Sequence, residues 1–106
     1  MLKVIKEETV KKLALILKPI RFNILELLTQ AGEPLSIDSL ADKLEESRAV
    51  TSFHIALLEE AGLVKSDFKI IEKPTKKKKG RAGQTYSITE EGMLLFQKLK
   101  AFLNEL

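Results

Sequence analysis

The chain has 106 residues, of which 44% are apolar and 31% are charged, with a formal net charge of +3 at pH 7. This composition is typical of one small globular domain, residues 1–106, and excludes a disordered chain. The absence of cysteine excludes disulfides and thiolate chemistry, and because no signal peptide or membrane-length apolar run is recognisable, we expect a cytoplasmic protein.

Two helices are predicted in the first third of the chain. Residues 3–17 carry apolar side chains at mixed three- and four-residue spacing, and Pro19 ends or kinks this helix. A second helix is expected from Pro19 to about Gln30, because proline suits a first turn and Gly32 suits the position after a last turn. The following "PLS" is a short extended link.

Two short capped helices come next. Ser36 is a suitable cap for a helix from Ile37 to about Leu44, and Ser47 for a helix that runs to about Ala61, with Gly62 as its stop. Only a short turn separates them. This arrangement predicts a helix-turn-helix, with residues 47–61 as the recognition helix.

After Gly62 the apolar period changes to two. Val64, Phe68 and Ile70 share one face of a predicted strand, and residues 84–88 form its partner. The segment "PTKKKKGRAG", residues 74–83, is then the tip of a hairpin. Thr89 caps a last helix, residues 90–106. The predicted fold is mainly α with a small β-hairpin wing, a winged helix-turn-helix with helices at both termini.

Three motifs resemble the ArsR-type winged-helix transcriptional regulators. These are "TSFHIALLEEAGLV" at residues 51–64, "PIRFNILELL" at 19–28 and "YSITEEG" at 86–92. The chain departs from that family at the turn, where glutamates 45 and 46 replace the usual glycine and apolar residue. It also has Thr51 where Val or Ala is usual, and Ser36 and Asp38 where metal-sensing members carry cysteines.

The recognition helix divides into two faces at about 100° per residue. The apolar face is predicted to hold Val50, Thr51, His54, Ile55, Leu57, Leu58 and Ala61. The candidate DNA-reading residues are Ser47, Arg48, Ala49, Ser52, Phe53 and Ala56. Arg48 is suited to a guanine edge or a phosphate, and Phe53 either meets a thymine methyl group or packs against the third helix or the hairpin. For His54 a half-buried structural role is favoured over that of a ligand or base.

Basic charge is concentrated in the wing. Residues 65–81 hold eight basic and two acidic side chains, a net charge of +6, which leaves −3 for the rest of the chain. The candidate phosphate-binding or minor-groove residues are Lys73, Lys76, Lys77, Lys78, Lys79 and Arg81. The alternative is that the lysine run only increases solubility.

The terminal helices are predicted to form a homodimer interface. Their candidate residues are Leu13, Leu17, Leu95, Leu99, Phe102 and Leu106, and family resemblance also implies a dimer, which would pair with a palindromic DNA operator.

The sequence therefore predicts a sequence-specific DNA-binding transcriptional regulator. The alternative is an architectural DNA-binding or protein-interaction module of the same fold. No nucleophile–base pair, phosphate loop or metal spacing is recognisable, so we expect no enzyme activity, no cofactor and no metal site.

Overall fold

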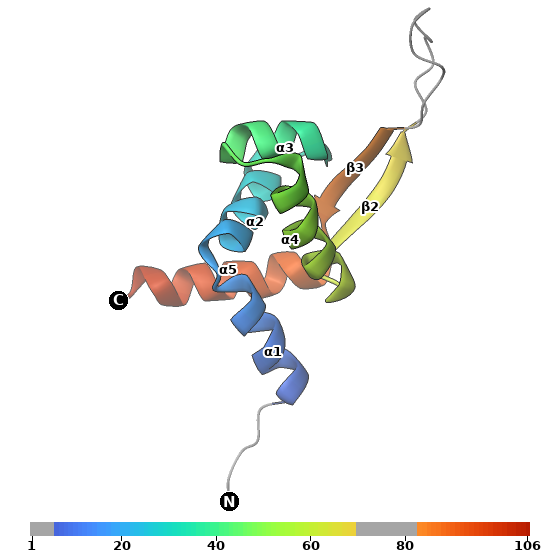
Figure 1. The fold of residues 1–106 in the computed structure, drawn as a ribbon. Helices are drawn as coiled ribbons and strands as arrows, with labels where there is room; N and C mark the ends of the chain where they lie inside the picture. The colour runs from blue at the N-terminus through green and yellow to red at the C-terminus, as the bar shows by residue number, and fades with distance from the viewer. Residues whose placement is uncertain (1–5, 70–82) are drawn as a thin grey trace, which may run out of the picture.

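The computed structural model describes residues 6–69 and 83–106, which form five helices and three strands. The predicted order of four helices, a hairpin and a last helix is confirmed (Figure 1). The elements are α1 (Glu7–Ile16), α2 (Pro19–Ala31), β1 (Leu35–Ser36), α3 (Ile37–Leu44), α4 (Arg48–Glu60), β2 (Val64–Lys69), β3 (Gly83–Ile88) and α5 (Glu90–Asn104).

All three predicted helix caps are present. The Ser36 hydroxyl accepts a hydrogen bond from the amide of Ser39, at 3.1 Å, and the Ser47 hydroxyl accepts one from Val50, also at 3.1 Å. The Thr89 hydroxyl accepts from the amide of Gly92 at 2.9 Å. Each of these bonds satisfies an amide that has no partner inside its helix, which fixes where the helix begins.

The terminal helices are shorter than predicted. Helix α1 begins at Glu7, because Lys6 has an extended backbone with φ −58° and ψ 133°, and residues 3–5 lie outside the described part. Helix α5 ends at Asn104 rather than at Leu106. The glutamates at the start of both helices suit the positive end of the helix dipole.

The helix-turn-helix turn is built on a strained residue. Glu45 has φ 58° and ψ 44°, which is the left-handed region. Its amide donates to the carbonyl of Asp42 at 3.2 Å, and the amide of Glu46 donates to Ala41 at 3.0 Å. This pair of bonds is a Schellman motif, which usually carries glycine at the Glu45 position. The turn therefore keeps the geometry of a glycine turn with glutamate in its place.

The sheet has a third strand where the sequence predicts only an extended link. Strand β3 lies between β1 and β2, and both pairings are antiparallel. Leu35 pairs with Tyr86, and Val64 with Ile88. A two-residue strand is too short to show any periodicity in sequence, and only its partner reveals it. Through this pairing, strand β1 connects the start of α3 to β3, the second strand of the wing.

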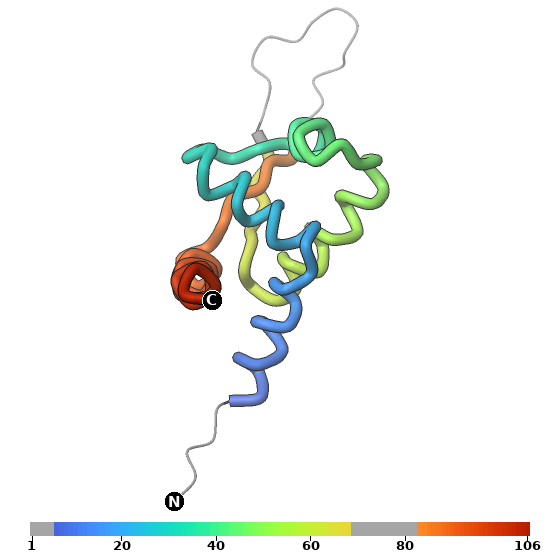
Figure 2. Tube along the Cα trace, turned by 90° about the vertical axis from the view of Figure 1, so that its left-hand side faces the viewer, coloured from blue at the N-terminus to red at the C-terminus, as the bar shows by residue number. Residues whose placement is uncertain are grey.

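One core holds these elements together. Its fully buried members include Ile24 and Leu25 of α2, Leu40 of α3, Leu58 of α4 and Phe96 of α5. Phe22 of α2 meets the Phe96 ring edge-to-face, with centroids 4.9 Å apart. In the two views α3 and α1 lie at opposite ends of the molecule, and α5 packs nearer to α1 (Figures 1 and 2). None of the helices in the described ranges is long and apolar enough to cross a membrane.

Candidate nucleic-acid interface

Helix α4 presents one face to solvent and buries the other. Thr51, Ile55 and Leu58 are buried, whereas the predicted reading residues are all exposed: Ser47, Arg48, Ala49, Ser52, Phe53 and Ala56. The predicted rotation of the helix is confirmed with one correction. Val50, predicted on the apolar face, is 38% exposed, and the buried face of α4 begins with its neighbour Thr51.

A hydrogen bond accounts for the buried threonine of α4. The Thr51 side chain is fully buried, and its hydroxyl donates to the carbonyl of Ser47 at 2.9 Å. A threonine is therefore tolerated in the core because its polar atom is satisfied within the first turn of α4. The same bond anchors the N-terminal end of the helix, where most of the candidate DNA-reading residues lie.

Phe53 is exposed, and of the two alternatives for its ring this exposure favours a contact with a ligand over packing against α3. Its side chain is 61% exposed, and its aromatic neighbour is His54, with ring centroids 5.1 Å apart in an edge-to-face arrangement. A pocket of about 490 Å³ is lined by Phe53, Ala56, Leu57 and two glutamates, 59 and 60. An exposed phenylalanine beside small residues leaves the ring free to contact a ligand on this face.

His54 is half-buried, as favoured from the sequence, and it has a partner that the sequence did not reveal. Nη1 of Arg21 lies 2.9 Å from Nδ1 of His54, and Nε of Arg21 donates to the carbonyl of Leu15 at 2.6 Å. Burial lowers the pKa of His54 below its ordinary value of 6.5, and the positive charges of Arg21 and Lys18 lower it further. The neutral ring can then accept a hydrogen bond from Arg21, which joins α1, α2 and α4.

The first residue of the recognition helix forms an ion pair with α3. Nε of Arg48 lies 2.7 Å from Oδ1 of Asp38, and both side chains are largely exposed. The sequence indicates Arg48 as a base or phosphate contact but does not connect it with Asp38, because the two residues are ten positions apart on separate helices. The pair places an acid on the same surface as the reading residues.

Phe68 of β2 is an exposed aromatic residue that is absent from the predicted site residues. It shares a strand face with Val64, which is buried, yet Phe68 itself is 62% exposed. Ser66 lies between them on that face and donates to the carboxylate of Glu59 on α4 at 2.8 Å. The alternation of a strand therefore puts Phe68 on the α4 side of the sheet.

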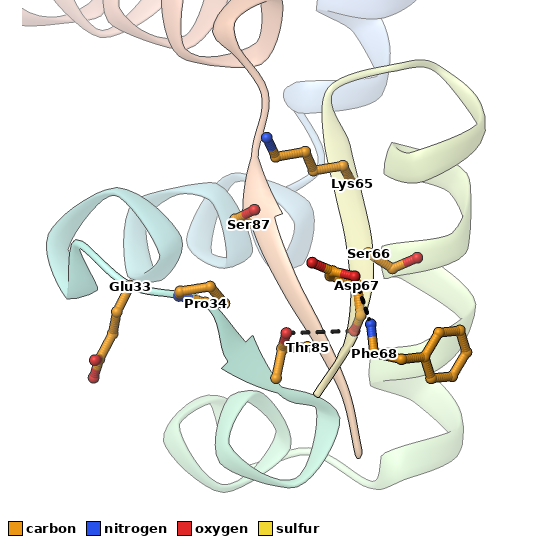
Figure 3. Close-up of a pocket in the computed structure, with 8 residues that line it drawn as sticks. All are labelled: Glu33, Pro34, Lys65, Ser66, Asp67, Phe68, Thr85 and Ser87. Atoms are coloured by element: carbon orange, nitrogen blue, oxygen red, sulfur yellow. Dashed lines mark hydrogen bonds between the residues drawn. The ribbon is translucent and has the colours of Figure 1, made fainter. Parts of the chain in front are cut away.

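The opposite side of the hairpin carries a polar pocket (Figure 3). Its volume is about 520 Å³, and its walls include Glu33, Lys65, Asp67, Thr85 and Ser87. In the close-up the Phe68 ring points away from these side chains. The carboxylate of Asp67 accepts a hydrogen bond from the amide of Phe68 at 2.8 Å, so this carboxylate is hydrogen-bonded within its own strand.

The basic residues predicted for the wing lie outside the described residues: Lys73, Lys76, Lys77, Lys78, Lys79 and Arg81. The strands that lead to them are described. Lys69 pairs with Gly83 at the far end of the β2–β3 ladder, and these strands run beside α4 and away from α5 (Figure 1). The root of the wing is thus at the same side of the molecule as the recognition helix.

The predicted dimer residues divide into two groups. Leu13, Leu95 and Leu99 are half-buried and pack on the domain's own core. Leu17, Phe102 and Leu106 are 53%, 58% and 87% exposed. Val10 lies two helical turns before Leu17 and is also exposed, so it extends the apolar face of α1 beyond the predicted residues.

Two ion pairs hold α5 on the domain. Nζ of Lys12 lies 2.5 Å from a carboxylate oxygen of Glu91, and Nζ of Lys100 lies 2.9 Å from Glu26 of α2. The ammonium of Lys100 lowers the pKa of Glu26. These contacts connect α5 with α1 and with α2.

Comparison with known proteins agrees with this architecture. Residues 16–67 match a helix-turn-helix domain family. A homodimeric winged helix-turn-helix DNA-binding domain from Mycobacterium bovis, described as a possible ArsR-family transcriptional regulator, is 19% identical and aligns with a TM-score of 0.70 over 93% of this chain and 81% of its own. The comparison with curated proteins finds no match.

Two further structures share the fold. A possible transcriptional regulator for arsenical resistance is 26% identical, with a TM-score of 0.62 over 87% of this chain and 82% of its own. Diamide-treated YodB from B. subtilis is 17% identical, with a TM-score of 0.73 over 98% of this chain and 97% of its own. The chain therefore has the winged helix-turn-helix fold, and in that fold it is similar to these possible regulators of the ArsR and arsenical-resistance type.

Proposed function

We propose that the protein is a sequence-specific, double-stranded-DNA-binding transcriptional regulator that acts by binding and not by catalysis. The observation that carries the proposal is the two-faced recognition helix. The buried face of α4 fixes the helix in the core, and the exposed face carries Arg48, Ala49, Ser52 and Ala56 together with the ring of Phe53. Small and polar residues there let a helix approach base edges in the major groove.

The wing supplies the second part of the proposed contact. The basic segment 74–83 lies in the chain between β2 and β3, which run beside α4, so its lysines are suited to the phosphate backbone or the minor groove. Phosphate contacts would provide affinity without sequence preference, and the recognition helix would provide the preference.

A symmetric dimer completes the proposal. The Mycobacterium bovis domain of the same fold is homodimeric. Exposed apolar residues on both terminal helices of this chain suit a similar assembly, in particular Val10, Leu17, Phe102 and Leu106. A twofold dimer presents two recognition helices and would pair with a palindromic operator.

Selection from a pool of random duplexes tests the proposal. We expect a palindromic motif to be enriched, and to bind at least about 10³-fold better than a scrambled duplex. Ser52→Ala should reduce that ratio, whereas Glu60→Gln, at the exposed C-terminal end of α4, should not. Equal binding to all duplexes would favour an architectural protein, and no binding to any duplex would favour a protein-interaction module.

A further inference from the structure

Asp38 occupies an unusual position for a carboxylate. It lies in the first turn of α3, is 73% exposed, and its Oδ1 is 2.7 Å from Nε of Arg48, the first residue of the recognition helix. This is the surface that carries the proposed reading residues. An unpaired carboxylate there would repel the phosphates of DNA.

Stability alone is a weak reason for this ion pair. Exposed pairs contribute little to folding, and both partners here are more than two-thirds exposed. Asp38 also suits the positive N-terminal end of α3, but an acid elsewhere in the first turn would serve that purpose equally well. The contact with Arg48 is the feature that is particular to this position.

The geometry of the guanidinium indicates what the pair is for. The carboxylate contacts Nε, which is on the side of the guanidinium group. The two terminal nitrogens, Nη1 and Nη2, can then donate in parallel from the tip. Two parallel donors match O6 and N7 of guanine in the major groove, which accept a bidentate contact from arginine.

The charges of the pair also favour a contact of Arg48 with a base over one with a phosphate. The carboxylate already compensates the positive charge of Arg48, so the arginine would gain less from a phosphate than a free cation does. An arginine whose orientation is set by an ion pair, at the N-terminal end of a recognition helix, is instead suited to reading a base edge.

We propose that Asp38 is a positioning residue that orients Arg48 for a bidentate contact with guanine, so that each half-site contains a guanine read by Arg48. This inference rests on the proposed function and names the base that one residue of the interface recognises.

The test compares the motifs that five proteins select from a random duplex pool: the wild type, Asp38→Asn, Asp38→Glu, Arg48→Ala and, as a matched control, Asp42→Asn. Asp42 is exposed one turn further along α3 and has no ion pair among residues 6–69 and 83–106. Replacing it removes the same charge from the same helix.

We expect Arg48→Ala and Asp38→Asn to lose the preference for guanine at one base pair of each half-site, by about tenfold or more, with the other positions of the motif unchanged. Both Asp38→Asn and Asp42→Asn should bind a scrambled duplex more tightly, because each removes a negative charge. Asp38→Glu, which keeps the carboxylate, should retain part of the guanine preference. A merely structural role for Asp38 would not affect a single base pair in this way.

Three outcomes would overturn the inference. The first is Asp38→Asn with tighter binding to every duplex and an unchanged guanine preference, which would make Asp38 only a repulsive charge. The second is Arg48→Ala with the wild-type motif and a salt slope lower by about 0.9, which would place Arg48 on a phosphate. The third is a wild type that enriches no motif, and only in this case does the proposed function fail as well.

Discussion

Gly92 of α5 lies directly against the backbone carbonyl of Leu63, at the junction of α4 and β2. A β-carbon at Gly92 would be less than 3.0 Å from the Leu63 carbonyl oxygen, and would also press on the side chain of Ile88. The same carbonyl accepts a hydrogen bond from the amide of Thr89 at 3.0 Å, so it cannot move away without breaking that bond. The glycine of "YSITEEG" therefore allows the last helix to dock at the end of the recognition helix.

Replacing Gly92 with alanine should lower the free energy of unfolding by about 1–3 kcal/mol, because the added methyl group meets backbone rather than a flexible side chain. Chemical denaturation measures the change. Gln97→Ala, at an exposed position of the same helix, should change stability by less than about 0.5 kcal/mol. A Gly92→Ala protein as stable as the wild type would show that the junction is not tightly packed.

The turn between α3 and α4 offers a stabilising substitution. Glu45 holds a left-handed conformation that costs a residue with a β-carbon about 1–2 kcal/mol. Glu45→Gly relieves this strain but increases the entropy of the unfolded chain, so we expect a net gain of about 0.5–1 kcal/mol. Glu46→Gly is the matched control. Glu46 does not have a positive φ, so glycine there should destabilise. Equal effects of both substitutions in thermal or urea unfolding would contradict the strain.

The burial of His54 beside Arg21 predicts how stability depends on pH. The pKa of His54 is lowered in the folded protein, so the unfolded chain binds more protons than the folded one as pH falls through about 6.5. Stability is therefore greatest above pH 6.5 and decreases towards the lower folded-state value. Glu26 remains ionised over this range, because its pKa is lowered from 4.5.

His54→Asn supplies the test, since its side-chain oxygen can still accept a hydrogen bond from Arg21 but does not titrate near neutrality. Urea unfolding of both proteins at pH 8, 7, 6 and 5.5 should show a decline in wild-type stability that the variant lacks. His54 is the one histidine of the chain, so no other imidazole contributes. A parallel decline in both proteins would assign the effect to other groups.

The features that can be predicted from sequence are those set by neighbours in the chain. Ser36, Ser47 and Thr89 cap helices through amides three residues away, and the buried face of α4 follows from its own periodicity. Features set by distant residues are not predictable in this way. Arg21 contacts His54, which lies 33 positions further along the chain, and strand β1 is recognisable only through its pairing with Tyr86.

The candidate site shows the same division. The exposure of Ser52 and Ala56 is predictable, because rotation along one helix decides it. Phe68 and the Arg48–Asp38 pair are not, since each depends on how a strand or a second helix packs beside α4. At Glu45 the fold requires a left-handed backbone conformation, which a glutamate does not prefer. Glu45 nevertheless adopts it, because the Schellman hydrogen bonds and the core on either side determine the chain direction.

The exposed apolar residues of the terminal helices predict which substitutions disrupt a dimer. Leu17→Glu combined with Phe102→Glu should give a monomer at tens of micromolar in sedimentation experiments, because two charges would be buried at the interface. Gln97→Glu is the control on the same helix. Gln97 is exposed and lies about 140° around α5 from Phe102, so its substitution should leave the dimer intact. A wild type that is monomeric at this concentration would reject the dimer.

The last prediction separates the wing from the recognition helix. Each lysine that neutralises a phosphate releases a counterion, so the slope of log affinity against log salt falls by about 0.9 for each lysine–phosphate pair that is removed. Four adjacent lysines cannot all reach phosphates at once. Replacing Lys76–Lys79 with glutamine should therefore weaken binding to operator and scrambled duplexes alike and flatten the slope by the equivalent of about two phosphates per wing.

Replacing Lys6, Lys11, Lys18 and Lys98, all exposed, makes the same change in net charge away from the wing and should alter the slope much less. Fluorescence anisotropy at several salt concentrations measures both effects. If the Lys76–Lys79 variant keeps its affinity and its slope, the lysine run serves solubility and the recognition helix binds without it.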